Sequence, residues 1–422
     1  MSYRAGNGTR QWDGSKKVPE ERMAVKMQSF ARTGITPDIA GADLSYSLKL
    51  QYDRWKEKGL ESTIEIVPYG EGKPQIPTAG NWWADEKYSH ERRVELGKKT
   101  QKYFKDGACI YTNESVVTIY AVVSNTTAEN EVVANDFYCC PSCGASCRIR
   151  ELMTGCPYCR TKFQMPDLFP KVTNFYFFED HPSQPRFLQT AVIVGAVIAF
   201  LYEAVNGIIR QDISALFSTL IAIPLGAFAG LLCGALPYLG YIIYKSVRGV
   251  GEISGSKKAE RKIRKKVIAV DSSFSYKLFE GQLISFLKMI LFSKDVKNLA
   301  CYEGTHIPEK YRNLIDISYR GALSLKDITI TDDAIKLKMS VPLRNTYFED
   351  NKIRVKNEKI VIQVAKKRSA LSNAGFSIKK VECRSCGGSF DGSHQRICPF
   401  CHNTYDMKEE NWVITEIGEK NQ

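Results

Sequence analysis

Histidine is scarce in this sequence, with five among 422 residues. The chain also lacks a nucleophile paired with a base, a glycine-rich phosphate loop, and two carboxylates placed for acid–base chemistry. Its first residues, MSYRAGNGTRQWDGSKK, have no apolar stretch of the kind that signal peptides carry, so we expect no signal peptide. These absences argue against catalysis. We expect a non-enzymatic protein whose length allows two or three domains.

Cysteine, in contrast, is abundant, and eight of the 13 cysteines form Cys-x-x-Cys pairs in two similar motifs. The first is CPSCGASCRIRELMTGCPYC (140–159) and the second is CRSCGGSFDGSHQRICPFC (383–401). Two Cys-x-x-Cys pairs joined by a short loop are typical of tetrahedral zinc, and four thiolates leave no open coordination position. The sequence therefore predicts two structural Zn²⁺ sites, in zinc ribbons over 139–160 and 383–402. The predicted ligands are Cys140, Cys143, Cys156, Cys159, Cys383, Cys386, Cys398 and Cys401.

Some ligand choices stay open at this point. Cys139 or Cys147 is an alternative ligand at the first site, and His394 and His402 are weaker candidates at the second. The stretch from Cys156 to Cys159 alone also resembles a glutaredoxin redox motif, but that motif needs a βαβ unit, which we do not recognise here. Thiolates remain free to bind zinc in a reducing compartment, which favours the cytoplasm for both ribbons.

Between the motifs, residues 187–244 contain two apolar runs, Phe187–Val205 and Ile213–Tyr244, joined by a short polar connection. A membrane-spanning helix needs about 20 apolar residues, so the runs predict an antiparallel transmembrane hairpin. Nine basic residues follow Tyr244, whereas the connection has Arg210 alone, which predicts two cytoplasmic termini. We expect a multi-pass protein of the cell (plasma or inner) membrane; a very apolar soluble hairpin is the alternative. Small residues at every fourth position favour close packing, within the hairpin or in a homo-oligomer.

The basic residues concentrate in segment 245–270, which we expect to be a juxtamembrane linker or helix. On a helix, Ala259, Ile263 and Val267 form a narrow apolar stripe with basic residues around it. Such a helix is expected to lie along anionic lipid; a solvated linker is the alternative, and nucleic-acid binding is a weaker one. The predicted lipid-binding residues are Lys257, Lys258, Arg261, Lys262, Lys265 and Lys266.

The remaining sequence predicts two cytoplasmic α+β domains. A polar, partly flexible segment (1–43) contains an expected helix at 19–32. The N-terminal domain (44–180) is expected to have helices at 44–58 and 84–105, followed by strands on both sides of the first ribbon. The C-terminal domain (271–422) begins with an amphipathic helix over 274–295. Alternating strands follow at 323–330, 334–348 and 352–367, and the second ribbon separates them from a last strand, NWVITEI (411–417).

This order of helices, long antiparallel strands and a final strand from Trp412 to Ile417 resembles the import-motor-anchor-like family. That family includes the C-terminal domain of the mitochondrial inner-membrane translocase anchor and bacterial relatives. The resemblance covers about residues 270–420 and implies a cone-shaped α+β fold like nuclear transport factor. It also implies a membrane-associated scaffold, in some members with a hydrophobic or lipid-binding pocket. The inserted ribbon departs from the translocase subunit, so a bacterial zinc-ribbon relative fits better.

The order of helices, strands, ribbon and strand occurs in both halves, which indicates either a duplication or two unrelated modules that share a ribbon. We expect an integral membrane scaffold or adaptor that holds zinc-stabilised domains for protein or lipid interaction. The alternative is a membrane-tethered nucleic-acid or ribosome binder. The sequence does not identify a protein partner.

Overall fold

The computed structural model describes most of the chain outside segment 179–257. The described residues are 19–68, 82–84, 88–126, 133–143, 145–178, 190, 193–198, 200–202, 205, 223–228, 258–272, 274–321, 323–370, 381–392 and 395–419. The chain divides into two compact units. One unit joins Met1–Glu179 with Ser256–Gln422, and the other is Asp180–Gly255.

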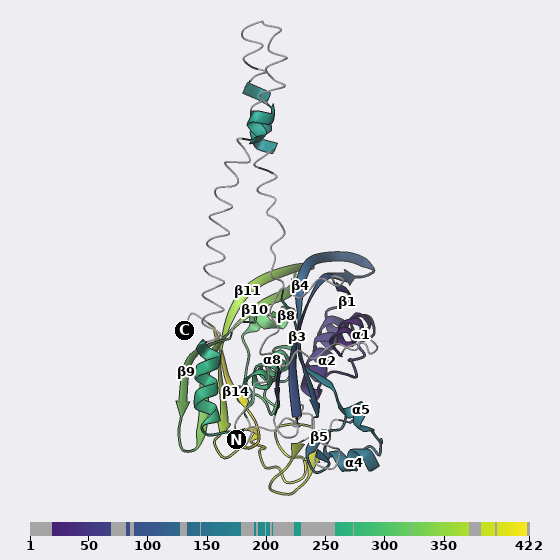
Figure 1. Ribbon diagram of the computed structural model, residues 1–422, viewed down its shortest axis with the longest axis vertical. Helices are drawn as coiled ribbons and strands as arrows, with labels where there is room; N and C mark the ends of the chain where they lie inside the picture. The colour runs from purple at the N-terminus through teal and green to yellow at the C-terminus, as the bar shows by residue number, and fades with distance from the viewer. Residues whose placement is uncertain are drawn as a thin grey trace. The chain divides into compact units, whose positions relative to one another are not determined.

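The first half of the larger unit has two helices followed by an antiparallel sheet (Figure 1). Helices α1 (Pro19–Thr33) and α2 (Ala42–Glu57) lie where the sequence predicts them. The sheet has the order β1-β3-β4-β7, with β2 beside β3. Its strands are β1 (Leu60–Pro68), β2 (Trp82–Ala84), β3 (Tyr88–Lys105), β4 (Ala108–Thr126) and β7 (Lys171–Phe178).

The second half has the same plan. A helix over 258–268 and α8 (Tyr276–Phe292) come first, followed by the short 3₁₀ helix η1 (Glu309–Asn313). The sheet has the order β8-β10-β11-β14, with β9 beside β10. Its strands are β8 (Leu314–Tyr319), β9 (Ser324–Ile330), β10 (Ala334–Glu349), β11 (Lys352–Lys367) and β14 (Val413–Glu419).

The correspondence between the halves extends to their long hairpins. β3 and β4 are joined by Asp106 and Gly107, and β10 and β11 by Asp350 and Asn351. All four turn residues have positive φ, as tight two-residue hairpin turns require. The two hairpins curve side by side in Figure 1, and at their tips Lys105 Nζ donates to Asn351 Oδ1 at 2.5 Å. The repeated order, pairing and turn geometry favour duplication over two unrelated modules.

The two halves share one core, which corrects the expectation of separate domains on either side of a membrane hairpin. Helix α2 packs against α8, and the Trp55 indole N–H donates to the Ile315 carbonyl at 2.7 Å. Arg54 donates to the Arg312 carbonyl at 2.7 Å. Side-chain donors of the first half therefore bind backbone carbonyl oxygens of the second half. Tyr120 and Tyr176 lie in the main cluster of the second half. Each half therefore buries apolar surface that it cannot cover alone.

The α+β class is compatible with this structure, although antiparallel sheet dominates it. The helix expected at 84–105 is wrong, because most of that segment forms β3, paired with β1 and β4. Its residues are mostly polar and favour helices, but Lys99, Gln101 and Tyr103 are buried at alternate positions. Lys99 Nζ lies 4.9 Å from the centre of the Phe177 ring. Because two of these buried residues are a lysine and a glutamine, the sequence does not show the alternation of apolar and polar residues that predicts a strand.

The expected transmembrane hairpin (187–244) and multi-pass membrane location are also corrected. Over the part of the chain that the structure describes, no helix combines the length and the apolar character needed to cross a bilayer. The described helical residues of this region include 193–198 and 223–228. They expose apolar side chains such as Ile193, Leu225 and Phe228. The other residues of the expected hairpin lie outside the described ones.

The contact between the halves is testable at Gly281 of α8. A Cβ at this position would lie 1.6 Å from Asn174 Oδ1 of β7, and Asn174 Nδ2 donates to the Lys277 carbonyl at 2.7 Å. Gly281→Ala should therefore lower the free energy of unfolding by about 1–3 kcal/mol through overpacking. Chemical denaturation of the full chain measures the change.

Gly418→Ala is the matched control, because the atom nearest to its added Cβ, the Val361 carbonyl oxygen, is 3.9 Å away. Equal stability of the Gly281→Ala variant and the parent chain would mean that α8 and β7 do not pack as described.

Candidate metal centres

The two predicted groups of four cysteines each come together in the structure. Within each group, all four sulfur atoms lie within 4.8 Å of one another. We call the group of Cys140, Cys143, Cys156 and Cys159 the first centre, and the group of Cys383, Cys386, Cys398 and Cys401 the second centre. The described cysteines are free thiols, so no disulfide explains either group.

The sulfur spacing fits a tetrahedral ion. Sγ–Sγ distances are 3.6 Å for Cys140–Cys159 and 3.8 Å for Cys143–Cys156 in the first centre. In the second centre they are 3.6 Å for both Cys383–Cys401 and Cys386–Cys398. An ion bound tetrahedrally by thiolates at about 2.3 Å requires sulfurs about 3.8 Å apart. Both centres are therefore able to hold a metal ion with all four positions filled by protein.

Backbone hydrogen bonds give the two centres the same local geometry. The N–H of each group's first cysteine donates to a carbonyl five residues later, Cys140 to Ala145 at 2.8 Å and Cys383 to Gly388 at 2.9 Å. Just after the last ligands, Arg160 and His402 have φ of 61° and 60°. Gly387, with φ of 70°, makes a tight turn after Cys386. Local sequence thus preorganises both sets of ligands.

The chemistry of the thiols links metal binding to pH. Hydrogen bonds from Thr161 lower the pKa of Cys159 to about 6, whereas burial raises the pKa of Cys140. Because metal binds the thiolate, protons and metal compete for the same sulfurs. Metal affinity is therefore expected to fall as the solution becomes more acidic.

The first ribbon carries its own small core. The hairpin of β5 (Phe137–Cys139) and β6 (Ser146–Arg148) holds the first knuckle, and α4 (Ile149–Thr154) separates it from the second. Ile149, Leu152 and Leu168 are fully buried with the ligands Cys140 and Cys156. This core places the ribbon in the connection between β4 and β7.

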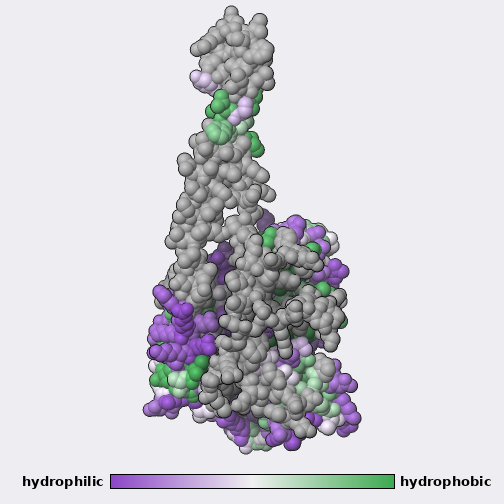
Figure 2. Space-filling model, in the orientation of Figure 1, coloured by the Kyte–Doolittle hydropathy of each residue, from purple (hydrophilic) through white to green (hydrophobic). Residues whose placement is uncertain are grey.

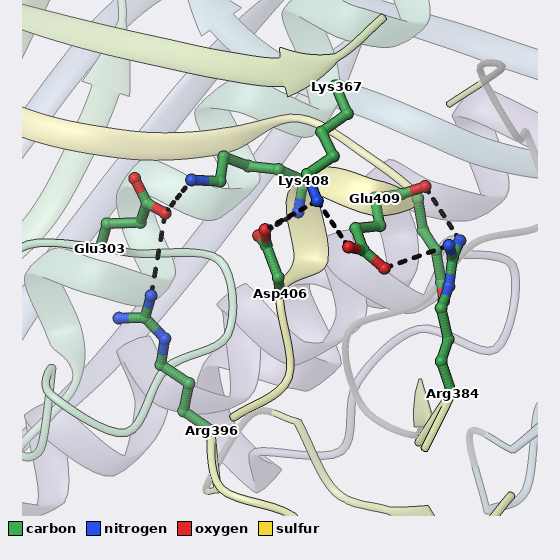
Figure 3. Close-up of polar contacts among 8 residues, drawn as sticks. Glu303, Lys367, Arg384, Arg396, Asp406, Lys408 and Glu409 are labelled. Atoms are coloured by element: carbon green, nitrogen blue, oxygen red, sulfur yellow. Dashed lines mark hydrogen bonds and ion pairs between the residues drawn. The ribbon is translucent and has the colours of Figure 1, made fainter. Parts of the chain in front are cut away.

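The second ribbon is fixed to the main body by ion pairs, which Figure 3 shows. Its short hairpin of β12 (Val381–Glu382) and β13 (Ser389–Phe390) and the 3₁₀ helix η2 (Met407–Glu409) lie between β11 and β14. Arg384 pairs with Glu409 at 3.1 Å, and Glu409 also binds Lys367 of β11 at 2.5 Å. Glu303 accepts from Lys408 at 2.6 Å and lies 3.8 Å from Arg396. Both arginines of the second ribbon are thus paired with acidic side chains of the protein.

The structure resolves part of the open ligand question. Cys147 is buried with its sulfur 3.7 Å from Cys156 Sγ, but it is not a member of the group in which all sulfurs lie within 4.8 Å. His402 is exposed and is not in the second group. The side chain of Cys139 and residue His394 lie outside what the structure describes.

The basic segment forms the helix over 258–268, with the spacing that the sequence predicts. Ala259, Ile263 and Val267 are buried, at 5%, 0% and 0% exposure, so the apolar stripe packs into the protein and is not available to lipid. The basic side chains Lys258, Arg261, Lys262, Arg264, Lys265 and Lys266 are exposed. Among the described residues, none of the six has an acidic side chain in ion-pair contact. Lys257 and residues 245–256 lie outside the described part.

A groove of about 730 Å³ runs beside this helix. Lys262, Lys265 and Lys266 form its cationic side, and Ile328, Thr329 and Ile330 of β9 lie opposite. Hydrophilic side chains gather on the β9 side of the larger unit in Figure 2. This arrangement offers exposed positive charge next to a partly apolar wall.

Sequence reasoning missed one feature of both ribbons. Tyr158 and Phe400 occupy the same position in their second knuckles and are 48% and 64% exposed. The signal was present as a proline followed by an aromatic residue inside each second cysteine pair. These aromatics offer a contact surface that does not belong to either core.

We expect two metal ions per chain in the full-length protein. Cys398→Ser should reduce this to about one ion and lower the thermal unfolding midpoint, because binding energy at a structural site is folding energy. Elemental analysis and a thermal melt measure both effects. Cys109→Ser, which changes an exposed cysteine outside both centres, is the control and should keep two ions. Metal-free parent protein with unchanged stability would contradict the assignment.

No family model, curated protein or solved structure matches this chain.

Proposed function

We propose that the protein is a non-enzymatic scaffold in which two zinc-stabilised halves present a basic helix to an anionic lipid surface. The observation that carries this proposal is the helix over 258–268, whose six basic side chains are exposed without acidic partners among the described residues. Its apolar stripe is already used for packing. The cations are therefore available for an external partner.

Zinc is the metal that fits the donor set best. Four cysteine sulfurs in tetrahedral spacing are typical of structural zinc, whereas hard ions such as Mg²⁺ and Ca²⁺ prefer oxygen ligands. Because the four thiolates fill the coordination sphere, neither site leaves a position for a substrate or an activated water. This supports a structural role for the metal and a scaffold rather than an enzyme.

Comparison of the two halves separates charge needed for the fold from charge that is surplus. Helix α1 takes the same place in the first half and contains three basic and two acidic residues. Helix 258–268 contains six basic and one acidic residue, Glu260, which itself lies 3.6 Å from Lys277. The same packing task is thus met without strong positive charge, so the charge of the second helix is not required for packing. Surplus charge of one sign favours a partner of the opposite sign.

Anionic lipid fits this surface better than nucleic acid. The helix offers lysines and arginines without an exposed aromatic side chain, whereas single-stranded nucleic acid is usually held by stacking as well as by charge. Both arginines of the second ribbon, Arg384 and Arg396, already bind acidic groups of the protein. Each basic residue near an anionic lipid surface contributes about 1 kcal/mol, less at high salt.

The resemblance of residues 270–420 to the import-motor-anchor-like family agrees with a scaffold. We infer that the resemblance extends to the first half, because two helices followed by the same sheet order occur there too. Protein partners and a homo-oligomer remain part of this proposal.

The test uses the full chain, because each half contributes to the core of the other. Purified protein should co-sediment with vesicles that contain phosphatidylserine and not with pure phosphatidylcholine vesicles. Lys262, Lys265 and Lys266→Glu should weaken this binding by roughly 100-fold, since each lost cation removes about 1 kcal/mol. Binding should also fall with rising salt.

The matched control reverses three exposed lysines that do not line the groove, Lys102, Lys297 and Lys352→Glu, and therefore changes the net charge equally. It should retain most of the binding. An equal loss in both variants, tighter binding to single-stranded RNA than to the anionic vesicles, or equal binding to neutral vesicles would reject the lipid proposal.

A further inference from the structure

The first centre contains a fifth thiol that the second lacks. Tyr138 pairs with Cys147 across the first ribbon hairpin, and Val381 pairs with Phe390 across the second. Cys147 and Phe390 each follow the first ligand of their centre at the same interval, from 140 to 147 and from 383 to 390. Cys147 therefore replaces the buried phenyl ring that the same fold uses in its other copy.

The fifth thiol lies directly against a ligand. Cys147 Sγ is 3.7 Å from Cys156 Sγ, and its other polar contact is the Ala145 carbonyl oxygen at 3.6 Å. Cys147 and Cys156 are 2% and 1% exposed, so the pair is enclosed by the ribbon's own core. Formation of a disulfide requires the two sulfurs to approach to about 2.05 Å. An approach of this size is within reach of side-chain rotation and a small shift of the β6 backbone.

We propose that Cys147 and Cys156 are an oxidation site that releases the metal of the first centre when the protein meets a hydroperoxide. The inference rests on the proposed zinc occupancy of that centre. The second centre, which has no fifth cysteine between 383 and 402, keeps its metal under the same conditions. The chain then holds one oxidant-sensitive and one oxidant-resistant ribbon.

The chemistry balances with hydrogen peroxide as oxidant. The Cys156 thiolate attacks one peroxide oxygen, so that an S–O bond forms, the O–O bond breaks and hydroxide leaves. The Cys147 sulfur then attacks the Cys156 sulfur, so that the S–S bond forms, the S–O bond breaks and the oxygen leaves as water with the Cys147 proton. The two sulfurs together lose two electrons, and the peroxide gains them. The metal loses one of four ligands and dissociates.

The position of the fifth thiol decides which centre reacts. Two pairs of ligand sulfurs lie 3.6 and 3.8 Å apart in the first centre, and two pairs lie 3.6 Å apart in the second, so direct ligand–ligand oxidation is equally open to both. A disulfide between two ligands removes two thiolates that the ion holds. Cys147 is outside the group of four, and its sulfur is free to attack while three ligands still hold the ion. Proximity of an uncoordinated thiol therefore favours the first centre.

The experiment treats the full-length zinc-loaded protein with hydrogen peroxide and follows zinc with a colorimetric chelator. About one of the two ions should leave in a fast phase, and mass spectrometry of a non-reduced digest should find Cys147 linked to Cys156. A thiol reductant with added Zn²⁺ should restore two ions. Absence of zinc from untreated protein would reject the proposed function itself, whereas two bound ions without the fast phase would reject this inference alone.

Two variants isolate the fifth thiol. Cys147→Ala and Cys147→Ser should each keep two zinc ions before treatment and should slow release from the first centre by roughly tenfold or more. Phe390→Cys should make the second centre sensitive as well, with Phe390→Ala as its control for the lost ring. Zinc release at the parent rate in both Cys147 variants, or a disulfide confined to the four ligands, would overturn the proposal.

Discussion

Two pairs of neighbouring strands in this protein are joined by long connections, and each connection contains one of the cysteine clusters. β4 pairs with β7 and β11 pairs with β14, in each case across about 45 intervening residues. A connection of that length carries a large entropic cost of closure unless part of it is ordered independently. An ion held by the four cysteines would order its middle, so that the final strand of each sheet would be presented near its partner. With such an ion bound, the sheet edges and the core beneath them would depend on this constraint.

The shared plan of the two halves provides a comparison within one molecule. What both halves share is what the fold needs: a pair of helices, the same strand order, tight hairpin turns and a four-cysteine cluster. What they do not share is available for other roles, because one half folds without it. The surplus cations of helix 258–268 and the thiol at Cys147 belong to this second class. The arginines of the second ribbon illustrate the opposite case, since Glu303 and Glu409 engage them in docking.

The sequence was most informative where the physical requirement is local. Cysteine spacing defined both clusters of four cysteines, and the four-residue period of Ala259, Ile263 and Val267 indicated the apolar face of a helix, which the structure buries in the protein. The helix expected at 84–105 was wrong because burial of Lys99 and Gln101 depends on the strands beside them. The shared core was equally hidden. Arg54 and Trp55 donate to backbone carbonyls more than 250 residues away, and any residue type offers such an acceptor. No pattern in the sequence distinguishes those carbonyls from others.

The shared core also determines when folding of the first half can be completed during synthesis. Ile315 and Phe348 belong to the apolar cluster of the first half, where they pack with residues such as Phe30 and Trp55. The ribosome delivers Phe30 and Trp55 long before either partner exists. Until the second half emerges, the nascent first half exposes an apolar face and an unsatisfied Trp55 indole. Chaperone demand should therefore be highest during translation of the segment between the halves, and a pause there would prolong the most aggregation-prone state of this protein.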